Sequence, residues 1–262
     1  MRWLVISDVH GNRFGLEAAL ASAKDQYSAV LCLGDVVGYG AHPNECCEIV
    51  RGLETNSVGV CSLLGNHDAA ALGILDSSWF NPVAKMAIQW TGKQLSAENR
   101  AWLHSLQPTL DKTDENFGAV HGSLREPLEE YIVDSSTALG TFEHMRWPIC
   151  FYGHTHVADC YLRREVKSLG LWGQPRSRRE LEHAALPNGG RIELHDECLY
   201  LLNPGSCGQP RDGNPQARYA IFDSEARTVE VHAVDYDWQA AREAIIAEGL
   251  PPVLGDRLGV GR

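Results

Sequence analysis

The alternation of apolar runs with amphipathic stretches near the start of the chain most constrains its fold. Arg2–Val9, Ala29–Leu33 and Val58–Leu64 have the composition of buried strands. Asn12 can cap a helix after the first run, and Asn44–Leu53 has helical spacing. Strands that alternate with helices in this way favour a parallel sheet covered by helices.

The rest of the chain contains a helical stretch followed by shorter strands separated by turns. We expect helices within Trp79–Leu106, at Ser136–His144 and at Trp238–Glu248. The six strand candidates are Phe117–Val120, Ile149–Tyr152, Asp159–Arg164, Glu197–Leu202, Tyr219–Asp223 and Thr228–Val234. This pattern predicts an α/β (α+β) fold in one domain, residues 1–262, with two facing sheets and helices outside.

The segment Arg163–Asn188 has the least regular pattern and carries more basic than acidic residues. We expect an exposed surface insertion at about residues 163–188. A solvated loop, a lid and an oligomer contact are the open alternatives for it.

Charge and composition limit the function. The chain has 34 Asp and Glu against 23 Lys and Arg, a net charge of −11. A nucleic-acid polymer is therefore not an expected partner, although a small anionic substrate is. No apolar run has the length of a membrane span or of a signal peptide, so we expect a cytoplasmic protein. The eight cysteines are scattered and form no CxxC pair, which favours reduced thiols.

Five predicted strands end in residues that can bind a metal. In chain order these residues are Asp8 and His10, Asp35, Asn66 with His67 and Asp68, His121, and His154 with His156. Open α/β sheets bind ligands at the carboxyl ends of their strands, so these side chains are expected to converge on one pocket.

The donor types indicate which metals such a pocket would hold. Imidazole, carboxylate and amide oxygen suit Mn, Fe, Zn, Co or Ni better than Ca or Mg. Seven donors are too many for one ion with an open position, but they fit two ions that share a carboxylate. We therefore expect two divalent metal ions, with Mn²⁺ first and Fe, Zn, Co or Ni as alternatives. Such a centre is a local trap for an anion inside an acidic protein.

The order of these motifs resembles the calcineurin-like metallophosphoesterases. The matching blocks are Asp8-x-His10, Gly34-Asp35, Gly65-Asn66-His67-Asp68, His121 and Gly153-His154-x-His156, and the resemblance extends to about Gly208. Longer matches, such as Asn203-Pro204-Gly205-Ser206, are most similar to a small prokaryotic branch of phosphodiesterases and diadenosine tetraphosphate hydrolases. The resemblance implies a four-layer αββα sandwich of two mixed sheets flanked by helices.

The resemblance also implies residue roles. Asp8, His10 and His156 would hold the first metal, Asn66, His121 and His154 the second, and Asp35 would bridge the two. His67 would be the general acid, with Asp68 orienting or charging its ring; a helix cap is the alternative role for Asp68. Tyr39, Asn12 and Arg211 are candidate substrate contacts to which no role is assigned.

The expected function is metal-dependent hydrolysis of a phosphoric ester. A dinuclear centre would cleave phosphodiester or phosphomonoester bonds of small phosphate esters or nucleotides by in-line attack of a metal-bridging hydroxide. Diadenosine polyphosphate hydrolysis and serine/threonine phosphoprotein dephosphorylation remain open as alternative activities. A non-catalytic protein-interaction scaffold with the same fold is the alternative of a different class, against which the complete set of donors and His67 argue.

Overall fold

The computed structural model describes residues 1–54, 58–169 and 174–262, and these form two mixed six-stranded sheets. The first sheet has the order β3-β2-β1-β11-β12-β9. Its strands are β1 (Arg2–Ile6), β2 (Ala29–Cys32), β3 (Gly59–Ser62), β9 (Gly190–Glu193), β11 (Ala217–Asp223) and β12 (Thr228–Val234). The second sheet has the order β4-β5-β6-β10-β7-β8. Its strands are β4 (Thr109–Lys112), β5 (Phe117–Val120), β6 (Ile149–Tyr152), β7 (Ala158–Leu169), β8 (Pro175–Ala185) and β10 (Cys198–Pro204).

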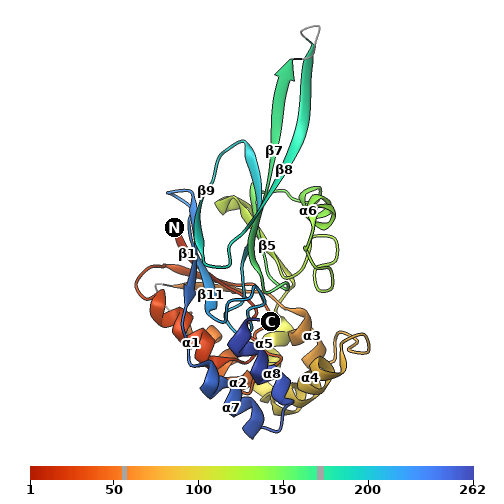
Figure 1. Ribbon diagram of the computed structural model, residues 1–262, viewed down its shortest axis with the longest axis vertical. Helices are drawn as coiled ribbons and strands as arrows, with labels where there is room; N and C mark the ends of the chain where they lie inside the picture. The colour runs from red at the N-terminus through yellow and green to blue at the C-terminus, as the bar shows by residue number, and fades with distance from the viewer. Residues whose placement is uncertain (55–57, 170–173) are drawn as a thin grey trace.

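Helices cover the outer faces of both sheets. The α-helices in the described ranges are α1 (Arg13–Ser22), α2 (Pro43–Gly52), α3 (Asn66–Ala71), α4 (Pro82–Gln94), α5 (Ala97–Ser105), α6 (Ser135–Phe142), α7 (Trp238–Ala247) and α8 (Pro252–Asp256). Most of them gather in the lower half of Figure 1, against the first sheet, while α6 lies beside the second sheet. The predicted sandwich of two mixed sheets flanked by helices is thus confirmed.

The alternation of side chains along β1 builds two separate cores. Leu4 and Ile6 pack against the helices, whereas Trp3 and Val5 face the second sheet. Between the sheets the Trp3 ring meets the Phe117 ring edge-on, with centroids 5.2 Å apart. Because side chains alternate with period two, one strand can serve both layers only when it is apolar at every position. This explains the unbroken apolar runs in the sequence.

Strand direction brings distant loops together at one edge. β1, β2 and β3 are parallel, and so are β5 and β6. The loops that follow these strands are joined by backbone hydrogen bonds, from Asp8 N to Gly34 O at 3.1 Å and from Gly153 N to His121 O at 2.9 Å. Asn12 caps α1 by accepting from Gly15 N at 3.2 Å, which directs the chain away from this edge.

β7 and β8 form a two-stranded ribbon that projects from the body (Figure 1). The prediction of an irregular segment within residues 163–188 is therefore wrong in its secondary structure; residues 170–173 lie outside the described ranges. Cross-strand charges help to pair the strands, with Arg164 Nη2 at 3.1 Å from Glu180 Oε2 and 2.7 Å from Glu182 Oε1. A ribbon without a buried face needs no apolar alternation, so its sequence carries no clear strand signal.

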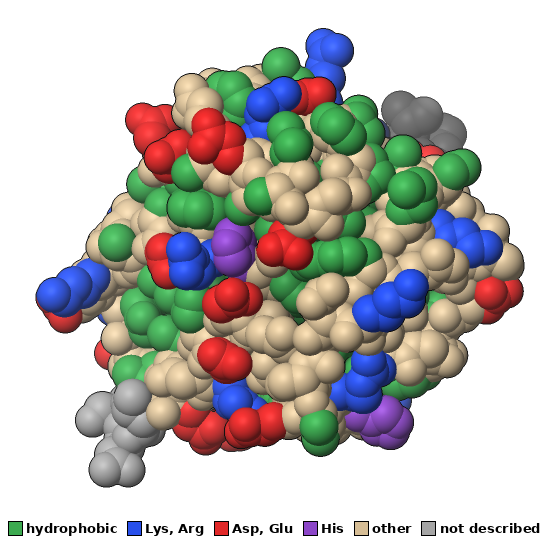
Figure 2. Space-filling model, turned by 90° about the horizontal axis from the view of Figure 1, so that it is seen from below, with side chains coloured by type: hydrophobic (Ala, Val, Ile, Leu, Met, Phe, Trp, Pro, Cys, Tyr) green, Lys and Arg blue, Asp and Glu red, His purple; other side chains and the backbone are tan. Residues whose placement is uncertain are grey.

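The cysteines, the helix lengths and the surface charge can each be compared with the sequence analysis. The eight cysteines all lie in described residues and are unpaired, and seven of them are buried. Within the described ranges, each helix is too short or too polar to cross a bilayer. Figure 2 shows acidic and basic side chains interspersed over the lower face of the molecule, so that face carries no broad basic track.

Candidate metal centre

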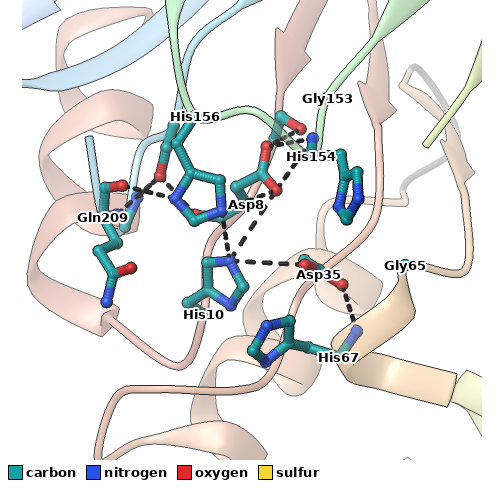
Figure 3. A network of polar contacts seen from close by, with 12 residues as sticks. Asp8, His10, Asp35, Gly65, His67, Gly153, His154, His156 and Gln209 are labelled. Atoms are coloured by element: carbon teal, nitrogen blue, oxygen red, sulfur yellow. Dashed lines mark hydrogen bonds and ion pairs between the residues drawn. The ribbon is translucent and has the colours of Figure 1, made fainter. Parts of the chain in front are cut away.

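The loops at the shared sheet edge bring the predicted donors together in two overlapping groups. One group consists of Asp8, His10, Asp35 and His156, and the other of Asp35, His121 and His154. Within each group the donor atoms lie within 4.8 Å of one another, and all of these residues are buried. The remaining predicted donor, Asn66 Oδ1, lies 3.0 Å from His121 Nε2. All seven predicted donors therefore share one site, part of which is drawn in Figure 3.

Asp35 joins the two groups through a single oxygen. Its Oδ2 lies 3.5 Å from His10 Nε2 and 3.5 Å from His121 Nε2. Its Oδ1 accepts a hydrogen bond from the backbone N–H of His67 at 2.8 Å, which fixes the carboxylate plane. Oδ2 is buried and has no hydrogen-bond partner. This oxygen therefore lies at the same distance from one histidine of each group.

The backbone at the donors is left-handed. Five of the eight non-glycine residues with positive φ in the described ranges are donors: Asp8 (53°), His10 (50°), Asp35 (52°), His154 (67°) and His156 (61°). Such residues are uncommon, and the conformation is costly unless the surroundings enforce it. The loops thus hold the donor positions in place through backbone shape.

Hydrogen bonds to carbonyl oxygens orient two of the rings. His121 Nδ1 lies 2.8 Å from Leu33 O, and His156 Nδ1 lies 2.7 Å from Gln209 O. A carbonyl accepts only from a protonated nitrogen, so Nδ1 of each ring is the donor and Nε2 is the nitrogen that faces the cluster. Figure 3 shows His156 between Gln209 and His10 in this arrangement.

Burial controls the charge of the cluster. It raises the pKa of Asp8 to about 7 and that of Asp35 well above its usual range. It lowers the pKa values of His10, His154 and His156 well below 6.5, so these rings are neutral near pH 7. The short contacts that His10 and His156 make with Asp8 and Asp35 are therefore not pairs of opposite charge.

Several buried polar atoms lack a partner, which tests whether the site fits a metal. Asp35 Oδ2, His10 Nδ1 and His154 Nε2 have no hydrogen bond among the described residues. His10 Nε2 and His156 Nε2 lie 2.9 Å apart. No Lys or Arg in the described ranges forms an ion pair with Asp8 or Asp35. Buried carboxylates, neutral imidazoles and unsatisfied donors together fit divalent cations.

His67 lies directly beside the cluster. Its ring meets the His10 ring edge-on at 4.7 Å and the Tyr39 ring at 4.4 Å between centroids. Its Nδ1 is buried without a partner, and burial lowers the pKa of the ring well below 6.5. His67 is thus neutral near pH 7 until a neighbouring negative charge raises its pKa.

Asp68 has the contacts of a helix cap. Its Oδ1 accepts from Val37 N at 2.9 Å and its Oδ2 from Gly65 N at 3.0 Å. Across the described ranges, no hydrogen bond joins its carboxylate to the His67 ring. Asp68 ties the start of α3 to the loop that carries Asp35, which is the capping alternative considered from the sequence.

Two further residues support the loops. Asn203 Nδ2 donates to Gly153 O at 2.9 Å and to Thr155 Oγ1 at 3.0 Å. Ser206 Oγ donates to Asp8 O at 2.8 Å. The Asn203-Pro204-Gly205-Ser206 motif therefore holds the loops after β1 and β6 in register.

A cavity of about 250 Å³ opens beside His67. It is lined by Tyr39, His67, Trp79, Phe80, Asn81, Ala84, Tyr131, Arg211 and Arg257. Tyr39 and Arg211 were candidates because they stand next to motifs, whereas Asn12 serves as the α1 cap. Sequence reasoning missed Trp79, Phe80, Tyr131 and Arg257, since none of them stands in a recognisable motif.

Comparison with known proteins decides the family. The sequence profile of the calcineurin-like phosphoesterase superfamily domain matches residues 1–227. The chain belongs to this superfamily. A protein of Methanocaldococcus jannaschii described as uncharacterized is 36% identical over 266 residues, covering 98% of this chain and 97% of that protein.

Solved structures agree with the calcineurin-like phosphoesterase fold. A metallophosphoesterase from Sphaerobacter thermophilus has a TM-score of 0.81 and 39% identity, covering 100% of this chain and 99% of that one. A hypothetical protein from Pyrococcus horikoshii has a TM-score of 0.74 and 20% identity, covering 100% and 98%. The latter is a likeness of fold alone. The buried Asp and His groups are thus candidate metal-binding residues of a calcineurin-like phosphoesterase.

Proposed function

We propose that this protein is a two-metal phosphoesterase that hydrolyses phosphodiester or phosphomonoester bonds of small phosphate esters or nucleotides. The observation that carries the proposal is Asp35 Oδ2, which is buried without a partner and lies 3.5 Å from a histidine of each donor group. Two-metal sites hold their ions about 3.5–4 Å apart, so one carboxylate oxygen can contact both.

The proposed ligands follow the two groups. The first ion would take Asp8, His10 and His156, the second would take Asn66, His121 and His154, and Asp35 would be shared. Mn²⁺ is the proposed metal, and Fe, Zn, Co and Ni suit the same donors. When bound, such a pair of ions supplies a nucleophile at neutral pH and stabilises negative charge on the phosphoryl oxygens.

His67 is the proposed general acid. It is not among the proposed ligands, and its ring borders both the cluster and the cavity. An anionic phosphoryl group beside the ring raises its pKa, which supplies the proton that the leaving oxygen needs. Asp68 is a positioning residue in this scheme, because its two backbone contacts hold His67 and Asp35 in register.

The cavity and the charge support a small substrate. A volume of about 250 Å³ suits a small organic group rather than a polymer. The net charge of −11 opposes binding along a polyanion. Buried, reduced thiols support the cytoplasm as the compartment.

The test is to load the purified protein with Mn²⁺ and to screen five substrates. These are an activated aryl diester, an activated aryl monoester, a cyclic nucleotide, diadenosine tetraphosphate and a phosphopeptide. We expect two ions per chain by elemental analysis and turnover of at least one small ester. Asp196→Asn, an exposed aspartate paired with Arg227, is the matched control and keeps both ions and activity. A protein that binds two ions and cleaves none of the five would contradict the proposal.

A further inference from the structure

Two arginines, Arg211 and Arg257, line the cavity beside His67. Arg211 Nη2 donates to Tyr39 Oη at 3.3 Å and to Gln209 Oε1 at 2.9 Å, and its Nε is buried without a partner. Arg257 Nε donates to the backbone oxygen of Arg262 at 2.5 Å. In the described part of the chain, neither guanidinium lies within 4.0 Å of an Asp or Glu oxygen.

The two positive charges also act on each other. Burial lowers the pKa of Arg257, and the charge of Arg211 lowers it further. Both side chains are half-buried, so water screens this repulsion only in part. Two like charges that share one cavity destabilise the empty site, and an anion between them would remove that cost.

Arg218 provides a comparison, because it is a buried arginine that pairs with an acidic residue of the same chain. This side chain is fully buried, and its Nη2 lies 3.1 Å from Asp212 Oδ2. The chain has 34 acidic residues, so acidic partners are abundant. Among the described residues Arg211 has no such ion pair, and its charge acts on Asp8 and Asp35 only from beyond 4.0 Å. An anionic ligand in the cavity would give it a closer counter-charge.

Aromatic rings also line the cavity. The Trp79 and Phe80 rings lie 4.3 Å apart between centroids, and Phe80 meets His67 edge-on at 5.2 Å. Trp79 is 47% exposed and Tyr131 38%, although both border the cavity. The Tyr131 ring is stacked on His154, with centroids 3.7 Å apart, so Trp79 is the partly exposed ring on which a planar group can stack.

We propose that this cavity binds the leaving group of the substrate, and that the leaving group carries a planar ring and a second phosphate held by Arg211 and Arg257. The inference rests on the proposed function, since His67 borders the cavity and would protonate the leaving oxygen there. It makes Arg211 and Arg257 specificity-determining residues. The substrate class is then a phosphate ester with at least two phosphate groups and an aromatic ring.

Binding to the full chain in EDTA tests the inference without catalysis. The probe is phenyl phosphate, which has both a ring and a phosphate, and the readout is its dissociation constant by calorimetry. Each guanidinium makes charge-assisted hydrogen bonds, so Arg211→Gln and Arg257→Gln should each weaken binding about tenfold or more. Arg211→Lys and Arg257→Lys keep the charge and should recover most of the affinity. Arg191→Gln, an exposed arginine paired with Glu230, is the matched control and should bind like the wild type.

Two comparisons separate the parts of the proposal. Trp79→Ala should weaken binding of phenyl phosphate about tenfold but leave binding of inorganic phosphate unchanged, because only the former has a ring to stack. Wild-type affinity in both arginine-to-glutamine variants, or no binding to the wild type, would overturn the inference. Hydrolysis of the simple aryl esters by the Mn²⁺-loaded wild type would still stand in that case, so failure here is distinct from failure of the proposed function.

Discussion

Asp8→Asn should stabilise the metal-free protein at alkaline pH while removing a metal ligand. Burial raises the pKa of Asp8 from 3.8 to about 7, which corresponds to about 4 kcal/mol of stability lost when the buried carboxyl ionises. Asparagine does not ionise and also tolerates the left-handed backbone at this position, where φ is 53°. The substitution thus removes the charge without straining the loop.

The sign of the pH dependence follows from the two pKa values. The folded chain holds the Asp8 proton more tightly than the unfolded chain. The wild type therefore loses about 1.4 kcal/mol of stability per pH unit between about pH 4 and pH 7, and no more above that range. In Asp8→Asn, residue 8 does not ionise, so it contributes no such decrease in stability with rising pH. Asp35 contributes its own slope to both proteins. Its charge also raises the pKa of Asp8, so the difference between the proteins reports on Asp8 together with this interaction.

Hydrogen bonds lost in Asp8→Asn reduce the gain in stability. Ser7 Oγ donates to Asp8 Oδ2 at 2.6 Å, and His154 N donates to the same oxygen at 3.1 Å. Losing one of these costs about 1 kcal/mol. We therefore expect Asp8→Asn to be about 2 to 3 kcal/mol more stable than the wild type in EDTA at pH 8, with a smaller gain at pH 5.

The assay is urea denaturation at pH 5, 6, 7 and 8, in EDTA and in excess Mn²⁺. With Mn²⁺ the order should reverse, because the ion stabilises only the chain that binds it well. Asp134→Asn is a control for which the expected change in stability has the opposite sign. The hydrogen bond from Thr137 N lowers the pKa of Asp134, so removing this carboxylate should destabilise the protein near pH 7. Curves for wild type and Asp8→Asn that stay parallel from pH 5 to pH 8 in EDTA would refute the reasoning.

Three further substitutions test the site. His67→Ala should keep both metals and lose activity by a factor of about 10²–10⁴, with a smaller loss for a nitrophenolate leaving group that needs no proton, as measured by kcat on both kinds of ester. Asp35→Asn should deplete metal in elemental analysis, because it weakens the oxygen that lies 3.5 Å from a histidine of each group. Gly65→Ala should also deplete metal and destabilise the protein by about 1–3 kcal/mol, since its Cβ would lie 2.0 Å from Asp35 Oδ1.

Each of these has an outcome that would contradict it, and Gly65→Ala also has a matched control. Gly59→Ala is the match for Gly65→Ala, because its Cβ would meet no atom within 4 Å, and it should retain metal. Equal losses on activated and unactivated esters would remove His67 from the acid role. Full occupancy of both metal sites in Asp35→Asn would contradict the shared ligand, and full occupancy in Gly65→Ala would contradict the tight contact.

The donors could be predicted from sequence because each stands at the end of an apolar strand. Asp8, Asp35 and His121 follow runs that are buried on both faces, and parallel pairing then carries their loops to one edge. Which strands pair depends on contacts between distant residues. Which sheet edge a loop reaches depends only on the direction of the strand before it. The seven donors therefore needed no contact information to be grouped.

The cavity and the ribbon could not be predicted in this way. Trp79, Tyr131 and Arg257 reach the cavity from loops and from the C-terminal region, and tertiary packing alone brings them together. β4 (TLDK) and β9 (GRIE) are partly exposed, so they lack the apolar run that marks the buried four-residue strands β2, β5 and β6. α3 was missed because its six residues begin at Asn66, within the motif itself.

The left-handed backbone at the donors bears on how such sites change over evolution. Asp and His both coordinate metals and are among the few residue types that accept positive φ, together with Asn and Gly. A descendant that abandoned catalysis would still be restrained at residues 8, 10, 35, 154 and 156 by the shape of its loops. Asp or His can therefore persist at these positions because of the backbone conformation alone. If a metal centre were lost, we expect glycine to be the first replacement at these positions, because it accepts positive φ without binding a metal.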